Sequence, residues 1–367
     1  MLTSELDYEL PESLIATAPA EPRDAARLMV IRRDCGEVSH HTVRELPELL
    51  ALGRRLDAPD LLVFNESRVL PAWFAAVRVA TGGAVTGLYL GPVTEAVGGW
   101  RVMLESGGRL RAGDRLALRD GTELELLAPR GDGEWRVACS SVEPAHAVLQ
   151  RVGEPPLPPY IRKRRARTGD APLQSGDAQR YNTVYARHDG SVAAPTAGLH
   201  FTHPLLEALR RSGVTTAAVT LHVGQGTFAP VRCERVEEHP IHREPFEVGP
   251  EAIERLRAAR EGGGRIIPVG TTTVRALESL PDPLPGPGRG HAGEASLLIT
   301  PGDGERAGHR FRFADALMTN FHLPRSTLLA LVAALPGVGV ERLLGWYRLA
   351  IAERYRFYSY GDAMLLL

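Results

Sequence analysis

The chain has 367 residues, 44% of them hydrophobic and 24% charged, with a formal net charge of −1 at pH 7. These proportions are those of an ordinary globular protein, and the length suffices for two domains. No apolar run approaches the roughly 20 residues of a membrane span, and the N-terminus lacks the layout of a signal peptide, so we expect a cytoplasmic protein without a membrane segment.

The cysteines and the single lysine exclude further classes of protein. The three cysteines, Cys35, Cys139 and Cys233, are far apart in the sequence and suit neither a disulfide framework nor a metal half-site. The only lysine, Lys163, lies between two arginines, whereas a phosphate-binding P-loop needs its lysine between a glycine and a serine or threonine. The sequence therefore excludes a P-loop NTPase.

The region from 73 to 139 alternates short strand-like runs with glycine-containing turns. Strands at such close and regular spacing predict a small β-barrel or sandwich. The expected strands are 74–79, 85–90, 100–104, 115–118, 123–127 and 134–139. The proline-rich segment 153–160 is then predicted to be a stiff linker.

Beyond residue 181, strand-like runs alternate with helical ones, which is typical of an α/β domain. The expected strands are 216–223 and 265–269, and the expected helices are 250–260, 274–280, 326–335 and 341–355. Residues 281–293 contain four prolines and four glycines, so we expect a surface loop there.

Two segments carry candidate binding groups. Residues 191–201 (SVAAPTAGLHF) are mostly small, so the backbone can approach a flat or bulky ligand, with Thr196 and His200 as polar groups at the edge. Thr271 and Thr272 follow the strand expected at 265–269. At the start of a helix, free N–H groups and hydroxyls bind anions or polar oxygens, or simply cap the helix.

Arg275 falls in the first turn of the helix expected at 274–280, where a cation opposes the helix dipole. This placement favours contact with a carboxylate or phosphate, and a surface salt bridge is the alternative. In TNFHLP (319–324), a strand is expected to end at Met318, so that Asn320 and His322 would lie at the carboxyl edge of the sheet. A loop in which Asn320 merely forms a turn is the alternative there.

Residues 162–167 (RKRRAR) hold five cations in six positions, in a region that we expect to be a loop. Such a run is ordinarily a solvated surface, and nucleic-acid binding is the more specific interpretation, since neutralising phosphates needs clustered cations. Two histidine pairs, 200/203 and 239/242, have no carboxylate or cysteine arranged as a metal site requires, so we expect no metal.

These segments, taken in chain order, resemble the S-adenosylmethionine:tRNA ribosyltransferase-isomerase family of queuosine biosynthesis. The matching segments are DYELPESLIA (7–16), LLVFNESRVLPA (61–72), PLPPYI (156–161), APTAGLHF (194–201), VTLHVGQGTFAPV (219–231), GTTTVRALES (270–279), TNFHLP (319–324) and YRFYSYGDAM (355–364). The resemblance implies an α/β fold: a discontinuous α/β catalytic domain, residues 1–71 and 157–367, with a small β-barrel domain, residues 72–156, inserted in it.

The resemblance also implies a reaction. S-adenosylmethionine serves as co-substrate, and its ribosyl unit is transferred and rearranged onto the 7-aminomethyl group of a deazaguanine at the wobble position of tRNA. Adenine and methionine leave, and epoxyqueuosine remains on the RNA. No metal or redox cofactor is required, and we expect a monomer that binds the anticodon region of tRNA.

Such a reaction needs a base beside the 5′ C–H that the sulfonium acidifies, and hydrogen-bond donors for the departing adenine. The candidates for proton transfer are His200, His222, His322 and Asp362. The candidates for binding the donor or the modified base are Thr196, Thr271, Thr272, Arg275, Asn320 and Tyr360. The candidates for binding tRNA are Arg162, Lys163, Arg164, Arg165 and Arg167.

A few positions depart from the pattern of the family. Ala26 stands where the family usually has serine, Trp73-Phe74 where it has Arg-Leu, and Asn182 where it has glutamine. These differences leave open a diverged paralogue with another substrate. A non-catalytic RNA-binding protein on the same scaffold is a further alternative, since it needs only the basic run and the barrel. A methyltransferase is disfavoured, because the acidic, glycine-rich turn that it needs after its first strand is missing.

Overall fold

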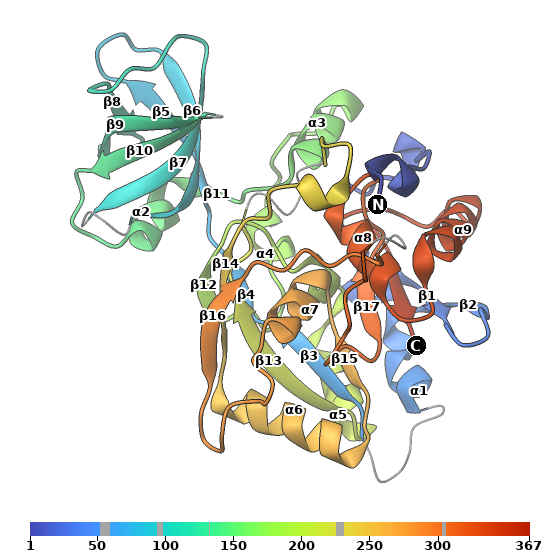
Figure 1. The fold of residues 1–367 in the computed structure, drawn as a ribbon. Helices are drawn as coiled ribbons and strands as arrows, with labels where there is room; N and C mark the ends of the chain where they lie inside the picture. The colour runs from blue at the N-terminus through green and yellow to red at the C-terminus, as the bar shows by residue number, and fades with distance from the viewer. Residues whose placement is uncertain (52–58, 94–97, 132, 225–230, 303–305) are drawn as a thin grey trace.

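The computed structural model describes residues 1–51, 59–93, 98–131, 133–224, 231–302 and 306–367, which form a small barrel and a larger α/β body (Figure 1). The barrel is an antiparallel sheet in the order β5-β6-β7-β10-β9-β8, closed by pairing of β8 with β5. Its strands are β5 (Trp73–Arg78), β6 (Ala84–Pro92), β7 (Gly99–Ser106), β8 (Arg115–Leu118), β9 (Glu123–Gly131) and β10 (Glu134–Cys139). All six expected strands are confirmed.

Alternate residues of these strands fill the barrel. Phe74 is fully buried, and a Cβ on Gly87 in the neighbouring strand would lie 2.2 Å from its ring, so this position has room only for glycine. Helix α2 (Ala145–Val152) packs its apolar side into the same core. The proline-rich segment that follows is not only a linker, because β11 (Gly153–Glu154) pairs with β5.

The larger body is built on a mixed sheet. One part has the order β15-β3-β13-β14-β16, in which β15 (Ile266–Pro268), β3 (Leu61–Asn65) and β13 (Thr215–Leu221) run parallel, and β14 (Glu244–Val248) and β16 (His291–Ala295) are antiparallel. The other part has the order β17-β18-β1-β2, formed by β17 (Leu317–Asn320), β18 (Ala363–Leu366), β1 (Arg27–Ile31) and β2 (Val38–Thr42). A parallel bridge between Val269 and Met318 joins the two parts.

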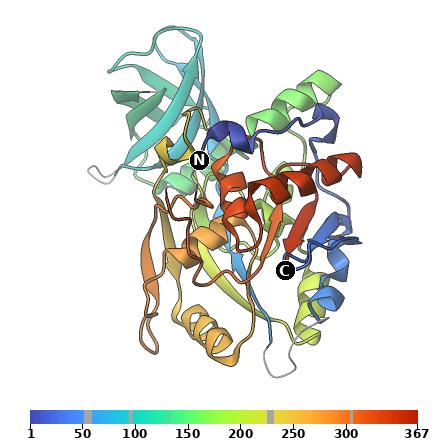
Figure 2. The same ribbon diagram turned by 45° about the vertical axis from the view of Figure 1, so that its right-hand side comes forward.

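Helices cover both faces of this sheet, so the body has separate cores on its two sides (Figure 2). Helices α8 (Thr327–Ala334) and α9 (Gly339–Ala352) share one core with β1, β17 and β18. Helices α1 (Leu46–Ala51) and α5 (His203–Arg211) lie in the core of the opposite face, and α6 (Pro250–Gly262) and α7 (Thr271–Glu278) pack against β3 and β13. The expected fold, a discontinuous α/β domain with an inserted β-barrel, is confirmed, while the domain boundaries at 71/72 and 156/157 stay a prediction.

The remaining elements belong neither to the barrel nor to the mixed sheet and the helices that cover it. They are α3 (Pro159–Thr168), α4 (Asp177–Arg180), the parallel pair β4 (Ser67–Val69) and β12 (His188–Ser191), and short 3-10 helices at Thr3–Leu6, Glu12–Leu14, Arg23–Ala25, Val43–Glu45, Thr196–His200 and Val236–Glu238. Within the described ranges, no single helix has the length and apolar character needed to cross a membrane, and α8 and α9 meet those criteria only as a pair bent by 111°.

Candidate active site

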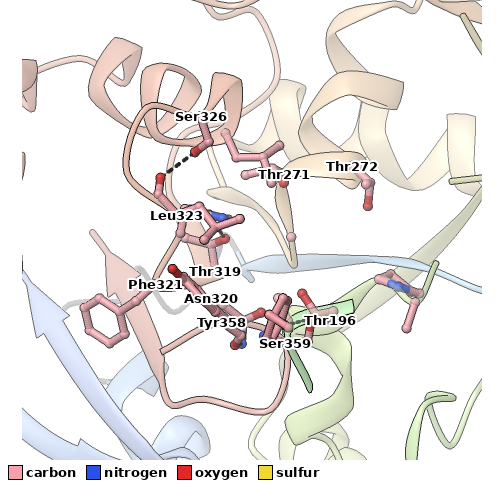
Figure 3. Close-up of a pocket in the computed structure, with 17 residues that line it drawn as sticks. Thr196, Thr271, Thr272, Thr319, Asn320, Phe321, Leu323, Ser326, Tyr358 and Ser359 are labelled. Carbon is pink, nitrogen blue, oxygen red and sulfur yellow. Dashed lines mark hydrogen bonds between the residues drawn. The ribbon is translucent and has the colours of Figure 1, made fainter. Parts of the chain in front are cut away.

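One pocket lies where four segments of the chain meet (Figure 3). Its wall contains residues 194–197, 270–272, 319–323 and 358–359, and Tyr160, Ser326 and Leu328 complete it. The sequence analysis singled out all four segments separately, and the structure brings them together. Thr196, Thr271, Thr272, Asn320 and His322 are the candidate site residues that line this pocket.

The pocket lies at the carboxyl edge of the sheet, as expected for Asn320 and His322. β15 and β17 run parallel as neighbours, and each is followed directly by a segment of the pocket wall. Gly270 has a φ of 92°, a value that favours glycine and allows the chain to turn from β15 into α7. Asn65, which the sequence analysis did not identify, ends β3 and exchanges hydrogen bonds of 3.0 Å with both backbone groups of Leu221.

Asn320 connects the pocket to His200. The Asn320 side chain is 3% exposed, and its Nδ2 lies 3.2 Å from Nε2 of His200 and 3.2 Å from the carbonyl oxygen of Tyr358. Since an amide nitrogen only donates, His200 accepts at Nε2 and carries its proton on Nδ1. Burial lowers the pKa of His200 to about 4, so the ring is neutral at pH 7. Oδ1 of Asn320 has no hydrogen-bond partner among the described residues, and a buried acceptor of this kind is suited to an N–H or O–H group of a ligand.

His322 lies in the pocket wall itself. Its Nε2 is 2.9 Å from Oγ1 of Thr319, its backbone N–H donates to the hydroxyl of Tyr347 at 2.9 Å, and its carbonyl oxygen accepts from the hydroxyl of Tyr8. Burial lowers the pKa of His322 to about 3. In the unliganded protein His322 is therefore a neutral hydrogen-bonding group and a weak base at pH 7.

Asp362 lies outside the pocket wall and is 1% exposed. Its Oδ1 accepts from Nε and Nη2 of Arg356 at 3.1 and 2.9 Å, and its Oδ2 accepts from the backbone N–H of the same residue at 2.8 Å. These bonds close a turn that contains Tyr358. Tyr358 has a φ of 72° and lines the pocket. Tyr360 on the same turn is also outside the wall, and its ring packs edge-on against Tyr181 with 6.0 Å between centroids.

The expectation that Arg275 lies in a first helical turn is wrong. Helix α7 begins at Thr271, three residues before the expected start, and this places Arg275 in its last turn, where a cation is favourable. Its guanidinium forms a buried ion pair with Glu244 and donates to the carbonyl oxygen of Ala295 at 3.0 Å. Arg275 lines a neighbouring hollow with His239 and His242, not the pocket that contains Thr271.

His222 follows β13 at the same edge of the sheet, but it does not line the pocket. Its imidazole packs against the backbone of Gly190, where a Cβ would lie 2.5 Å from Nδ1. Burial lowers the pKa of His222. Of the four candidates for proton transfer, His322 is thus the one that lines the pocket. His200 is connected to the pocket by its hydrogen bond with Asn320, which lies in the pocket wall.

The basic run 162–167 is helical, not a loop as expected. Pro159 at the first position of α3 and the left-handed Gly169 at its end define this helix. Arg165 is 1% exposed and forms a bidentate ion pair with Asp177 at 2.6 and 3.0 Å, so it is withdrawn from any surface contact. Because of this buried ion pair, Arg165 is not available for binding tRNA in the way expected for the other four cations of the run.

Sequence reasoning also missed Tyr160, which it treated as part of a linker. Its hydroxyl donates to Oγ of Ser359 at 2.6 Å and accepts from the backbone N–H of Ser359 at 3.0 Å, so the start of α3 is tied to the C-terminal turn. The rings of Tyr160 and Tyr358 pack edge-on at 4.8 Å. The segment PLPPYI carried the only signal, through the family resemblance.

The three departures from the family pattern lie outside the pocket wall. Asn182 accepts from the backbone N–H of Val69 at 2.9 Å and donates to the carbonyl oxygen of Ala178 at 3.0 Å. Ala26 is buried beside β1, and Trp73 lies on the outer face of the barrel. Within the described ranges, no group of three or more histidine, cysteine or carboxylate side chains is placed to hold a metal ion.

Comparison with known proteins identifies the family. A family model described as "Queuosine biosynthesis protein" matches residues 3–366. The S-adenosylmethionine:tRNA ribosyltransferase-isomerase of Anaeromyxobacter dehalogenans is 49% identical over 372 residues, covering 100% of this chain and 99% of that protein. The protein of the same name from Symbiobacterium thermophilum is 44% identical over 368 residues, covering 100% of both chains. A crystal structure of S-adenosylmethionine tRNA ribosyltransferase from Thermotoga maritima is 35% identical, with a TM-score of 0.53, over 99% of this chain and 100% of that one. The chain therefore belongs to the queuosine biosynthesis protein family.

Proposed function

We propose that this protein is an S-adenosylmethionine:tRNA ribosyltransferase-isomerase. It transfers and rearranges the ribosyl unit of S-adenosylmethionine onto the 7-aminomethyl-7-deazaguanine at the wobble position of tRNA, giving epoxyqueuosine, adenine and methionine. Full-length similarity to relatives with this name supports the proposal. The observation that carries it is the convergence of four distant segments on one pocket at the carboxyl edge of the sheet.

The pocket suits a cationic donor because the imidazole in its wall, His322, and the one behind Asn320, His200, are both neutral. A protonated histidine beside the sulfonium of S-adenosylmethionine would repel it, and the low pKa values of His200 and His322 keep both rings uncharged. S-adenosylmethionine acts as co-substrate, and the sulfonium acidifies the 5′ C–H that must lose its proton. The lining residue His322 is the proposed partner for this step, and Asn320 is the proposed acceptor for an N–H or O–H group of the substrate.

The other candidates have supporting roles in this proposal. Thr196, Thr271 and Thr272 offer hydroxyls to the polar groups of the donor. Asp362 and Tyr360 hold the C-terminal turn in place, and Arg275 stabilises the sheet through Glu244.

The proposed tRNA substrate gives a role to helix α3. We assign its cations Arg162, Lys163, Arg164 and Arg167 to phosphates near the anticodon, and we exclude Arg165 because of its buried ion pair. The proposed protein works as a monomer in the cytoplasm.

The test is a reaction of the purified protein with S-adenosylmethionine and tRNA that carries the 7-aminomethyl-deazaguanine wobble base. The expected result is adenine release that needs both substrates, together with a nucleoside of the mass of epoxyqueuosine. A matched tRNA with guanine at the wobble position is the control and should release no adenine. Folded protein that yields neither product from authentic tRNA would overturn the proposal, and S-adenosylhomocysteine in place of adenine would indicate a methyltransferase.

A further inference from the structure

A groove lies between the barrel and helix α3, next to the pocket. One wall is the outer face of the barrel, where three large side chains lie opposite one another on adjacent strands: Trp73, Leu88 and Met103. The opposite wall is formed by α3 and the residues before it, including Pro159, Arg162 and Lys163. None of these groove residues lines the pocket.

The groove combines an aromatic surface with positive charge. The guanidinium of Arg162 lies over the indole ring of Trp73, 4.3 Å from its centroid, a cation–π arrangement that holds the ring and the charge together. Lys163 is exposed on the same wall, and Glu105 is the one acidic side chain among the described residues that line the groove. Aromatic faces with adjacent cations are the usual means of binding unstacked bases and the phosphates between them.

The groove and the pocket are lined by consecutive residues at two places in the chain. Pro159 lines the groove and Tyr160 lines the pocket, and Ala193 and Ala194 are divided in the same way. Consecutive Cα atoms are about 3.8 Å apart, so the two hollows are immediate neighbours. An RNA strand that places one base in the pocket would therefore carry the next nucleotides into the groove.

We propose that this groove binds the anticodon-loop nucleotides that flank the wobble base of tRNA, with one unstacked base on the stacked pair of Trp73 and Arg162 and a phosphate on Lys163. The proposal rests on the function proposed above. It divides the cations of α3 into two sets, because Arg164 donates to the carbonyl oxygen of Ser13 at 3.2 Å and Arg167 forms an ion pair with Glu12. The groove-facing set is expected to dominate RNA binding.

The experiment measures the Kd of a fluorescently labelled anticodon stem-loop RNA by anisotropy over a series of salt concentrations. Trp73→Ala is expected to weaken binding about 10-fold, whereas Trp73→Phe keeps an aromatic face and should remain close to the wild type. Lys163→Ala should reduce the slope of log K against log salt by about 0.7, the loss of one single-strand phosphate contact. Val77→Ala is the matched control, since Val77 is 48% exposed on the same strand but outside the groove.

Unchanged Kd and unchanged salt slope in both Trp73→Ala and Lys163→Ala would overturn the groove assignment. Equal binding of a blunt RNA duplex without a loop would overturn it as well. The binding measurement needs no turnover, so its failure differs from a failure of the proposed function, which is read from adenine release by the wild-type protein. The Lys163 variant changes an exposed side chain and tests the proposal even if Trp73→Ala disturbs the barrel.

Discussion

Asn320 donates a hydrogen bond of 3.2 Å to Nε2 of His200, and this contact determines both the tautomer of the imidazole and the orientation of the amide. The amide cannot be turned over, because its nitrogen also donates to the carbonyl oxygen of Tyr358. The residues come from segments 120 positions apart in the chain. The result is a buried acceptor, Oδ1 of Asn320, in a residue of the pocket wall.

Replacing Asn320 should therefore impair turnover more than folding. For Asn320→Ala we expect kcat/KM for adenine release to fall about 10- to 100-fold, the usual cost of removing a partner from buried polar groups. Asn320→Asp should be at least as impaired, because a carboxylate cannot donate to His200 and Tyr358. Steady-state kinetics with varied S-adenosylmethionine checks this, with His203→Gln, outside the pocket wall, as control. Wild-type kcat/KM in Asn320→Ala would exclude it from the site.

Acid should destabilise the protein through its two buried imidazoles. His200 and His322 have folded-state pKa values of about 4 and about 3, below the ordinary value of 6.5. Between each folded-state pKa and 6.5, the unfolded state therefore binds more protons than the folded state. Stability from this source is complete above about pH 6.5 and declines as the pH falls towards 4. Urea unfolding from pH 4 to 8 measures this. In His322→Asn the slope near pH 5 should be smaller by about 1.4 kcal/mol per pH unit. A slope identical to that of the wild type would contradict the burial of a neutral His322.

Arg275 should matter for stability, not for substrate contact. Arg275→Met removes the guanidinium that pairs with the buried carboxylate of Glu244 and is expected to cost about 3–5 kcal/mol of unfolding free energy. Replacing both residues, Arg275→Met with Glu244→Leu, should restore much of that loss, because no uncompensated charge remains. Denaturant unfolding distinguishes the two. A stable Arg275→Met variant with an increased KM for S-adenosylmethionine would instead support the anion contact that the sequence suggested.

Gly198 should tolerate no side chain. A Cβ at this position would lie 2.0 Å from the hydroxyl oxygen of Tyr185 and 2.9 Å from Cγ2 of Thr183, so Gly198→Ala must displace either these side chains or the short helix Thr196–His200. We expect a loss of about 1–3 kcal/mol in unfolding free energy and lower activity, since Thr196 and Ala197 line the pocket. Gly286→Ala, where a Cβ would meet nothing within 4 Å, is the control for thermal unfolding. Equal melting temperatures for the two variants would refute the packing argument.

Local patterns predicted the elements well where turns and periodicity agree. The strands at 115–118 and 134–139 are found with the expected bounds, because glycine turns delimit them and alternate residues face the core. Helix α3 was not predicted, although Pro159 and Gly169 mark its ends. Its many charges suggested a loop, and of its two buried residues, Ile161 and Arg165, only the first is apolar, so the sequence shows no apolar periodicity there.

Long-range pairs account for the rest of what the sequence could not predict. Arg275 meets Glu244 from 31 residues away, and Tyr160 meets Ser359 across 199 residues, and no local spacing indicates either contact. The burial of Arg165 against Asp177 depends likewise on how α4 docks on α3. Composition and family resemblance identified the pocket segments, whereas the division of roles among their side chains required the fold.

Ribosyl transfer can be followed directly with S-adenosylmethionine labelled with ¹³C either in its ribose or in its methyl group. After reaction with tRNA that carries the 7-aminomethyl-deazaguanine base, mass spectrometry of the nucleosides locates each label. All five ribose carbons are expected in the modified nucleoside, with one adenine released for each nucleoside formed, and the methyl label is expected to stay in methionine. Methyl label in the tRNA, or no ribose label there, would contradict ribosyl transfer.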